Sequence, residues 1–344
     1  MRYFICLSYN GSAFSGWQIQ ENANSVQAEL QKALSTLLRQ PIEVVGAGRT
    51  DAGVNARNYI AHFNYNGNMP DQPHTIYKLN AILPKEISIH SVWPVAEDMH
   101  ARFSATSRTY KYYIHTEKDP FCSQFSHFVP ARKLNIEKMN EACQYFLGEQ
   151  DFSSLEKVNG GNKTSICNVT HAAWEPLYPN SAGAPGTSGA PEISSAPGIS
   201  SAPGTPCSSE ANSITGTSSA PGTTSAPGTS NAPGTAGITE TTGITEAIST
   251  SEATAASETA TVPEPTHYVF TVTANRFLRN MVRAMVGSLL EVGSGKREPE
   301  WIKQMLQQKN RSAAGHSVPG NALFLVEVRY PEEALRPLTL IRPK

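Results

Sequence analysis

The segment Gly46-Ala-Gly-Arg-Thr-Asp-Ala-Gly53 follows a short apolar stretch, residues 42–45, that is typical of a strand. Its glycines favour a tight turn, which would present Arg49 and Asp51 two residues apart. A dinucleotide fingerprint would need glycine at position 51, and a P-loop would need Gly-Lys-Ser/Thr, so neither motif is present. Two interpretations remain: Asp51 accepts backbone N–H bonds within a solvated turn, or it is a carboxylate kept ionised by guanidinium groups and acts as nucleophile or base.

Hydrophobic periodicity on both sides of this turn predicts short strands that alternate with helices. Strands are expected at residues 3–9, 42–45, 59–65, 87–95, 106–115, 165–174, 267–273 and 322–329, and helices at 26–38, 135–147 and 277–292. Because this alternation occurs in both halves of the chain, it predicts an α+β protein of two related lobes.

Residues 175–265 have a different composition, dominated by Pro, Gly, Ser and Thr, with Ala-Pro recurring at a period of six. A hexapeptide solenoid needs an aliphatic residue at one fixed phase, whereas the isoleucines here change phase. The segment cannot bury enough apolar surface to offset its ordering entropy. We therefore expect a disordered low-complexity insert with a hexapeptide repeat.

The insert also hides the charge of the remainder. The 344-residue chain has a formal charge of -1, but residues 175–265 hold eight Glu and no Lys, Arg or Asp. The remaining residues are moderately basic, which excludes a strongly cationic DNA-packaging protein but not a selective binder of phosphate backbone. The five cysteines are scattered and contain no CxxC pair, so they predict neither a disulfide scaffold nor a cysteine-type zinc site. No signal-peptide pattern follows Met1, and a cytoplasmic protein is expected.

The motif GRTDAGVNA at 48–56 resembles the GRTDAGVHA signature of the tRNA pseudouridine synthase A family. Further similar blocks occur in family order: SYNGSAFSGWQIQ (8–20), SVQAELQKAL (25–34), NAILP (80–84), HARFSATSRTYKYYI (100–114), NRFLRNMVRAMVGSLLEVGSG (275–295), KNRSAAG (309–315) and ALFLVEV (322–328). The resemblance implies an isomerase that converts uridine to pseudouridine at positions 38, 39 and 40 in the anticodon stem-loop of tRNA. It implies no metal and no organic cofactor.

The resemblance also assigns residues. Asp51 matches the catalytic aspartate and Arg49 its nearby arginine. Arg283 matches the arginine that pairs with this aspartate. Tyr110 matches the tyrosine that stacks on the target base.

Other candidates come from periodicity. On a strand, Arg108 and Tyr110 share one face, which suits contacts with phosphate and base, although aromatic strand residues are usually core. On a continuous helix, Arg276, Arg279 and Arg283 share one face. Arg276 and Arg279 then either contact phosphates or form a solvated basic face. We expect Arg108, Arg276 and Arg279 to bind the substrate.

The family architecture implies two ferredoxin-like lobes that share one continuous antiparallel sheet flanked by helices, and a homodimer. The domains expected are residues 1–105 with the Asp51 loop, residues 106–174 together with 266–344, and the insert at 175–265. Two departures from the family pattern, Asn55 in place of His and Ala322 in place of Gly, are expected to tune RNA contacts. The main alternative is a non-catalytic tRNA-binding or tRNA-folding protein, and another is a hydrolase with Asp51 as nucleophile.

Overall fold

A computed structural model describes residues 1–67, 69–130, 134–157, 164–178 and 265–332, all within one compact unit. The predicted insert at 175–265 falls mainly on residues outside these ranges. The strands are β1 (Arg2–Tyr9), β2 (Val44–Gly46), β3 (Asn55–Asn64), β4 (Ile87–Val95), β5 (Ser107–His115), β6 (His127–Phe128), β7 (Gly148–Asp151), β8 (Ile166–Leu177), β9 (His267–Ala274) and β10 (Leu323–Arg329). The α-helices are α1 (Val26–Leu38), α2 (Gln72–Ile82), α3 (Ile136–Cys143), α4 (Met281–Gly293) and α5 (Trp301–Gln307).

The strands form one largely antiparallel sheet in the order β4-β1-β3-β10-β5-β9-β8-β7, with β2 paired to β3 and β6 paired to β5. Two pairs are parallel, β10 with β3 and β5 with β6, so the expectation of a purely antiparallel sheet is wrong at these places. β10 is the last strand in the described part of the chain and joins the two halves of the sheet, because it lies between β3 and β5. The α+β class and the continuity of the sheet are confirmed.

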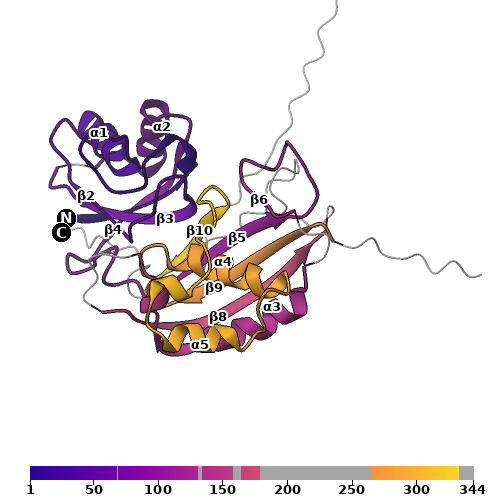
Figure 1. The fold of residues 1–344 in the computed structure, drawn as a ribbon. Helices are drawn as coiled ribbons and strands as arrows, with labels where there is room; N and C mark the ends of the chain where they lie inside the picture. Colours follow the sequence, from indigo (N-terminus) through magenta and orange to yellow (C-terminus); the bar gives the residue numbers. More distant parts are fainter. Residues whose placement is uncertain (68, 131–133, 158–163, 179–264, 333–344) are drawn as a thin grey trace, which may run out of the picture. The chain divides into compact units, whose positions relative to one another are not determined.

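Helices flank both halves of the sheet (Figure 1). α1 and α2 lie beside β1 and β3, and one hydrophobic cluster joins buried side chains of α1, such as Leu30 and Leu34, to those of both strands. A second cluster joins α3, α4 and α5 to β5, β8 and β9. Burying a leucine side chain stabilises a fold by about 1.5–3 kcal/mol, so these clusters are the main source of stability.

Helix α1 follows the sequence pattern closely. The Ser25 side chain accepts a hydrogen bond from the Ala28 N–H at 3.3 Å, as an N-cap does. Apolar residues three and four apart are buried, and Arg39 ends the helix in the left-handed conformation. Within the described ranges, no helix combines the length and apolar character that a membrane span requires.

Other elements differ from the predictions. The helix expected at 135–147 ends at Cys143 and continues as a short 3-10 turn. The helix expected from 277 begins only at Met281, because Asn280 has a positive φ of 69°. α2 was not predicted, since only Thr75 and Leu79 are buried on it and its apolar pattern is weak. β8 runs to Leu177, three residues further than expected.

The buried His62 of β3 makes the stability of the fold depend on pH. Its Nδ1 accepts a hydrogen bond from the Ala101 N–H at 3.1 Å. Burial, together with charge repulsion from Arg2 and His100, lowers the pKa of His62 to about 4. Between this value and the unfolded pKa of about 6.5, the unfolded chain binds a proton that the folded chain does not. This contribution to stability is complete above about pH 6.5 and is lost as the pH falls towards 4.

We therefore expect the free energy of unfolding to fall by on the order of 2 kcal/mol from His62 alone between pH 7 and pH 4.5. Urea unfolding of wild type and His62→Gln across this range measures the contribution. The glutamine variant should show the weaker pH dependence, since it cannot titrate there. His74→Gln, on an exposed position of α2, is the matched control. Equal pH slopes for wild type and His62→Gln would contradict this account.

Candidate active site

The loop between β2 and β3 carries Asp51, and close backbone packing holds this loop in place. A Cβ atom on Gly11 would lie 2.2 Å from the Val54 carbonyl oxygen, and one on Gly16 would lie 2.3 Å from that of Thr50. Gly16 also has a positive φ of 99°. Because side chains are excluded at these two positions, residues 11–17 pack directly against the Asp51 loop.

Two arginines pair with the Asp51 carboxylate. Arg279 Nε donates to Oδ1 at 3.2 Å, and Arg283 Nη1 donates to Oδ2 at 3.5 Å. The side chains of Asp51 and Arg283 are 20% and 23% exposed, whereas that of Arg279 is 47% exposed. The pair with Arg283 is therefore less screened by solvent than the pair with Arg279. The structure brings together the two residues that the family resemblance pairs, and adds Arg279.

A loop that follows α5 holds Arg283 from the other side. Arg283 Nε donates to the Val318 carbonyl oxygen at 2.7 Å, and the Val318 N–H donates to the Arg283 carbonyl at 3.3 Å. Asn280 Nδ2 donates to the Ser317 hydroxyl at 2.6 Å, and this hydroxyl also accepts from Arg311 Nη2 at 2.9 Å. The Arg283 guanidinium group that faces Asp51 is thus held in place by two elements, the helix α4 that carries it and the loop at Val318 that it contacts.

Gly287 of α4 allows this loop to approach the helix. A Cβ at Gly287 would lie 1.7 Å from the His316 carbonyl oxygen. The neighbouring Ser288 hydroxyl accepts from the Gly315 N–H at 3.0 Å. The sequence contains Gly287 on a predicted helix, where glycine is unfavourable, and that mismatch was the available signal for a close contact.

We expect Gly287→Ala to lower the free energy of unfolding by about 1–3 kcal/mol, because backbone atoms of the loop must move to admit the methyl group. Urea unfolding measures the change. Gly48→Ala is the matched control, since a Cβ there meets no atom within 4 Å and should leave stability nearly unchanged. A Gly287→Ala variant as stable as wild type would show that the loop does not depend on this approach.

Tyr110 lies on β5 between the two hydrophobic clusters and contacts both. Its ring packs edge to face on Phe277, with the ring centroids 5.1 Å apart. Burial raises the pKa of Tyr110, Arg108 opposes this rise and the charge of Asp51 adds to it, so that the resulting pKa is about 12. The phenol is therefore neutral, and it lies close enough to Asp51 to be influenced by its charge.

Arg108, which was expected to bind the substrate, forms hydrogen bonds to the protein backbone around the site. Its guanidinium group donates to backbone carbonyl oxygens of four residues, among them Asn275 at 2.7 Å and Ala105 at 2.9 Å. The others are Ala47, next to the Asp51 loop, and Arg102. Arg108 therefore joins the loop before β5 to the segments of Ala47 and Asn275, which a strand pattern cannot reveal.

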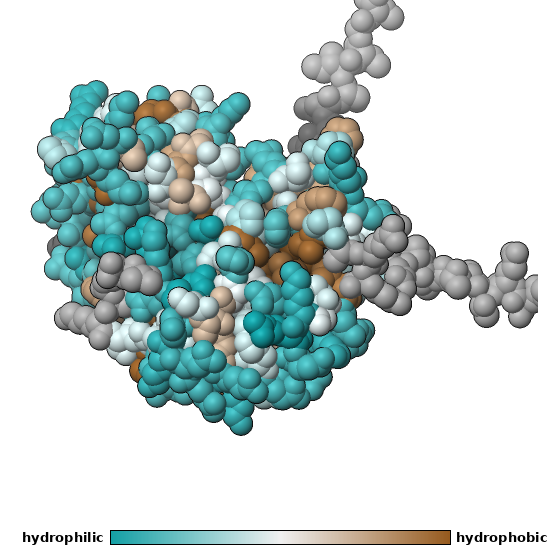
Figure 2. All heavy atoms as spheres, in the orientation of Figure 1, coloured by the Kyte–Doolittle hydropathy of each residue, from teal (hydrophilic) through white to brown (hydrophobic). Residues whose placement is uncertain are grey.

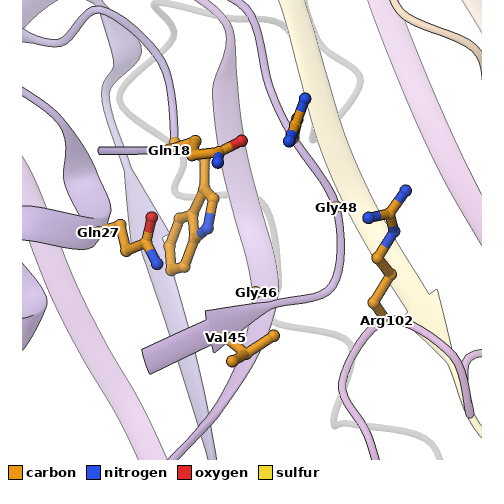
Figure 3. Close-up of a pocket in the computed structure, with 8 residues that line it drawn as sticks. Gln18, Gln27, Val45, Gly46, Gly48 and Arg102 are labelled. Atoms are coloured by element: carbon orange, nitrogen blue, oxygen red, sulfur yellow. The ribbon is translucent and has the colours of Figure 1, made fainter. Parts of the chain in front are cut away.

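Arg49 is exposed and, among the described residues, forms no hydrogen bond or ion pair with Asp51. It lines a partly open pocket beside the Asp51 loop, together with Trp17, Gln18, Gln27, Val45, Gly46, Gly48 and Arg102. Figure 3 shows Gln18, Gln27 and Arg102 around this pocket, with Val45 and Gly46 on β2. Arg102 was not predicted as a site residue, although it lies in one of the family motifs and is followed by Phe103, which is 76% exposed. The pocket thus has two cationic side chains at its border.

The prediction of one continuous basic helix face is wrong, because Arg276 and Arg279 precede α4. Arg279 nevertheless reaches Asp51, as the turn before the helix redirects it. Arg276 is half-buried and lies near Cys167 of β8. Burial raises the pKa of the Cys167 thiol to about 11, and the positive charge of Arg276 opposes that rise.

Asn55, which stands where the family has His, is a buried polar residue. It is 2% exposed, its Oδ1 accepts from the Gly11 N–H at 2.8 Å, and its Nδ2 donates to the Asn321 carbonyl at 2.7 Å. Ala322 is fully buried. Asn55 therefore joins the segments of Gly11 and Asn321 near Asp51, and the expectation that these two positions tune RNA contacts stays a prediction.

The fold and this site define a class of protein: an α+β fold in which one carboxylate pairs with two arginines near a neutral, buried tyrosine. A family model described as tRNA pseudouridine synthase matches residues 234–331. The chain is 37% identical to tRNA pseudouridine synthase A of Parabacteroides distasonis over 332 residues, which cover 96% of this chain and 97% of that protein. It is 39% identical to the protein of the same name from Bacteroides thetaiotaomicron, covering 96% and 91% of the two chains. The chain belongs to the tRNA pseudouridine synthase A family.

Proposed function

We propose that this chain isomerises uridine to pseudouridine in tRNA with Asp51 as the reactive carboxylate. Family membership supports the class of enzyme, an isomerase that acts on tRNA. The role of Asp51 is supported by one observation: its carboxylate pairs with Arg279 and Arg283 and remains partly exposed, although the loop around it is closely packed. Two cations stabilise the ionised carboxylate next to an anionic RNA substrate, where an isolated carboxylate would be repelled.

The chemistry explains why a single carboxylate suffices. The bond between C1′ of the ribose and N1 of uracil breaks, the base turns while it stays bound, and C5 forms a new bond to C1′. Substrate and product are isomers, so the reaction needs no electron carrier and no activated donor. The detached base must stay in the pocket and water must stay out, which requires a well-packed site.

The neighbouring residues have distinct proposed roles. Tyr110 supplies an aromatic surface for the extruded base, and its neutral phenol serves as a hydrogen-bond donor. Arg283 and Arg279 position Asp51. Arg49 and Arg102 contact phosphates at the border of the pocket, next to the exposed ring of Phe103. Arg108 supports the loops that carry these groups, and we retain Arg276 as a candidate RNA contact.

We further propose that the substrate region is the anticodon stem-loop and that positions 38, 39 and 40 are modified. A base in a stem must leave its stack to reach Asp51, and a protein selects such a base by the shape of the RNA more than by its sequence. A homodimer, in which one subunit holds the tRNA body while the other receives the anticodon arm, suits this selection. We place the reaction in the cytoplasm.

The proposed domain organisation supports the same arrangement. Residues 1–105 form one ferredoxin-like lobe with the Asp51 loop, and residues 106–174 with 266–344 form the other. Asp51 and Arg283, which pair across the sheet, come from different lobes in this division. The two separate hydrophobic clusters are consistent with it. The insert at 175–265 lies mainly outside the described residues and has no role in this proposal.

The experiment is an assay of the purified full-length chain with unmodified transcribed tRNA. Carbodiimide-dependent stops of reverse transcription map the pseudouridines, and we expect new stops at positions 38 to 40. A tRNA with cytidine at these positions is the control and should give none. Binding of tRNA without any pseudouridine would favour the non-catalytic alternative and overturn the proposal. Product at other positions would overturn only the assignment to the anticodon arm.

A further inference from the structure

Three side chains that the proposed reaction does not use gather where β9 begins. Asp119, Cys122 and His267 each offer one ligand atom, and these atoms all lie within 4.8 Å of one another. Asp119 and Cys122 lie in the loop between β5 and β6, and His267 is the first residue of β9. Far apart in the sequence, they meet because β5 and β9 are antiparallel neighbours, with His115 and His267 opposite each other.

The local structure holds each of these groups. Asp119 Oδ1 accepts the Phe121 N–H at 2.8 Å, which fixes the turn that brings the carboxylate close to the Cys122 thiol. The ring of His267 stacks on that of His115, with the centroids 5.9 Å apart, and its Nδ1 lies 3.1 Å from the Thr266 hydroxyl. When a histidine binds a metal through one ring nitrogen, a hydrogen bond at the other nitrogen, like this one, fixes the orientation of the ring.

Burial differs among the three residues in a way that suits an edge site. Cys122 is only 4% exposed, whereas Asp119 and His267 are half-buried. A cation can therefore reach the carboxylate and the imidazole from solvent and contact the sulfur at the inner side. Among the described residues, this is the one group of three such side chains close enough to share an ion.

We propose that Asp119, Cys122 and His267 bind a divalent transition-metal ion of the zinc type. Zinc takes carboxylate oxygen, thiolate sulfur and imidazole nitrogen as ligands at about 2.0–2.3 Å in a tetrahedron. Ligand atoms in such a tetrahedron are roughly 3.4–3.8 Å apart, so the three atoms need only small movements. Calcium and magnesium prefer oxygen alone and do not fit this set. Water fills the fourth position.

The consequence of this site is mechanical. Bound metal would link the loop between β5 and β6 to the point at which the chain enters β9. Because the ligands are brought together only by folding, the free energy of binding adds to the stability of the folded state. None of the three residues contacts Asp51 or its arginines in the described structure, so the role differs from the proposed reaction.

The experiment uses the full-length, tag-free protein after removal of metals with a chelator, and the probe is zinc alone. Competition with a chromophoric chelator should show one zinc per chain. Cys122→Ser, Asp119→Asn and His267→Asn should each weaken zinc binding by at least about 10–100-fold. Cys6→Ser and Asp98→Asn remove a thiol and an exposed carboxylate elsewhere, and should bind zinc as wild type does. Zinc should raise the Tm of wild type and of both controls, but not that of Cys122→Ser.

Cobalt gives a second measurement that does not depend on stability. Wild type with cobalt should show a thiolate-to-metal charge-transfer band and the intense visible bands of a tetrahedral site. Both should be lost in Cys122→Ser, and the visible bands should change in Asp119→Asn, whose side chain is near the surface and whose folding is the less affected. Failure of wild type to bind zinc, or unchanged zinc and cobalt binding in Asp119→Asn, would overturn the proposal.

Discussion

Asp51→Asn should abolish pseudouridine formation, with a fall in the single-turnover rate of at least about 10³-fold. The substitution keeps the volume of the side chain and replaces one carboxylate oxygen by an amide group, so the loop that close glycine packing holds should stay in place. What is lost is the charge that Arg279 and Arg283 contact. An amide is neither a nucleophile nor a base at neutral pH.

The same substitution should leave the affinity for tRNA unchanged or higher, since it removes a negative charge near RNA phosphates and frees two arginines. Filter binding at fixed ionic strength measures the affinity, and the product assay measures the rate. Asp98→Asn, on an exposed position, controls for loss of a surface carboxylate. Turnover by Asp51→Asn in preparations free of host enzyme would falsify the assignment of the reactive group.

Arg283→Ala should give the second largest loss, about 10²–10³-fold in kcat with little change in KM. Arg283 contacts Asp51 through Nη1 and the Val318 carbonyl through Nε, so its removal releases the carboxylate and one side of the loop at once. Lysine offers a point charge without the planar fork, and Arg283→Lys should recover only part of the loss.

Arg279→Ala is the matched comparison. Arg279 pairs with the same carboxylate at 3.2 Å but is about twice as exposed, so its effect on kcat should be smaller. Steady-state rates with saturating tRNA separate the two variants. Normal turnover by Arg283→Ala, or a larger loss in Arg279→Ala, would contradict the order that burial predicts.

The distribution of hydrophilic and apolar residues separates the charged groups of the site from the apolar residues that support them. Figure 2 shows most of one face as hydrophilic, with apolar residues gathered around the region of β5 and β10. The arginines that meet Asp51 or line the pocket come from loops and from the first turn of α4, not from the strands. Substitutions that change rate and substitutions that change stability should therefore separate along these segments.

Local sequence patterns predicted those parts of the fold that local physics determines. The apolar period and Ser25 cap predicted α1, and the glycine-rich motif predicted a loop that presents Asp51, whose side chain is 20% exposed. The pairing of Arg283 with Asp51 followed from family resemblance, since no local pattern joins residues so distant. Arg279 was assigned to phosphates because a helix was assumed to begin before it, and the positive φ of Asn280 cannot be inferred from helical periodicity.

Other features depended on tertiary contacts alone. The strand pattern predicts an exposed cation at Arg108, yet its guanidinium group contacts four backbone carbonyl groups, two of them from the loop before β5 and two from distant segments. Asn55 reads as a variant of a polar position, and only the fold shows that Gly11 and Asn321 bury it. α2 buries too few side chains to show a helical period, so its sequence pattern resembles that of a loop.

The position of β10 has a consequence for how the protein is made. Of the described strands it is the last to leave the ribosome, and until it does, β3 and β5 lack the partner that lies between them. Synthesis is slow compared with the folding of small domains, so the earlier part of the chain waits with two unpaired strand edges. Insertion of Leu323–Arg329 closes both edges at once and joins the halves that carry Asp51 and Arg283. We therefore expect a nascent chain that lacks these seven residues to be inactive and prone to associate through its open edges.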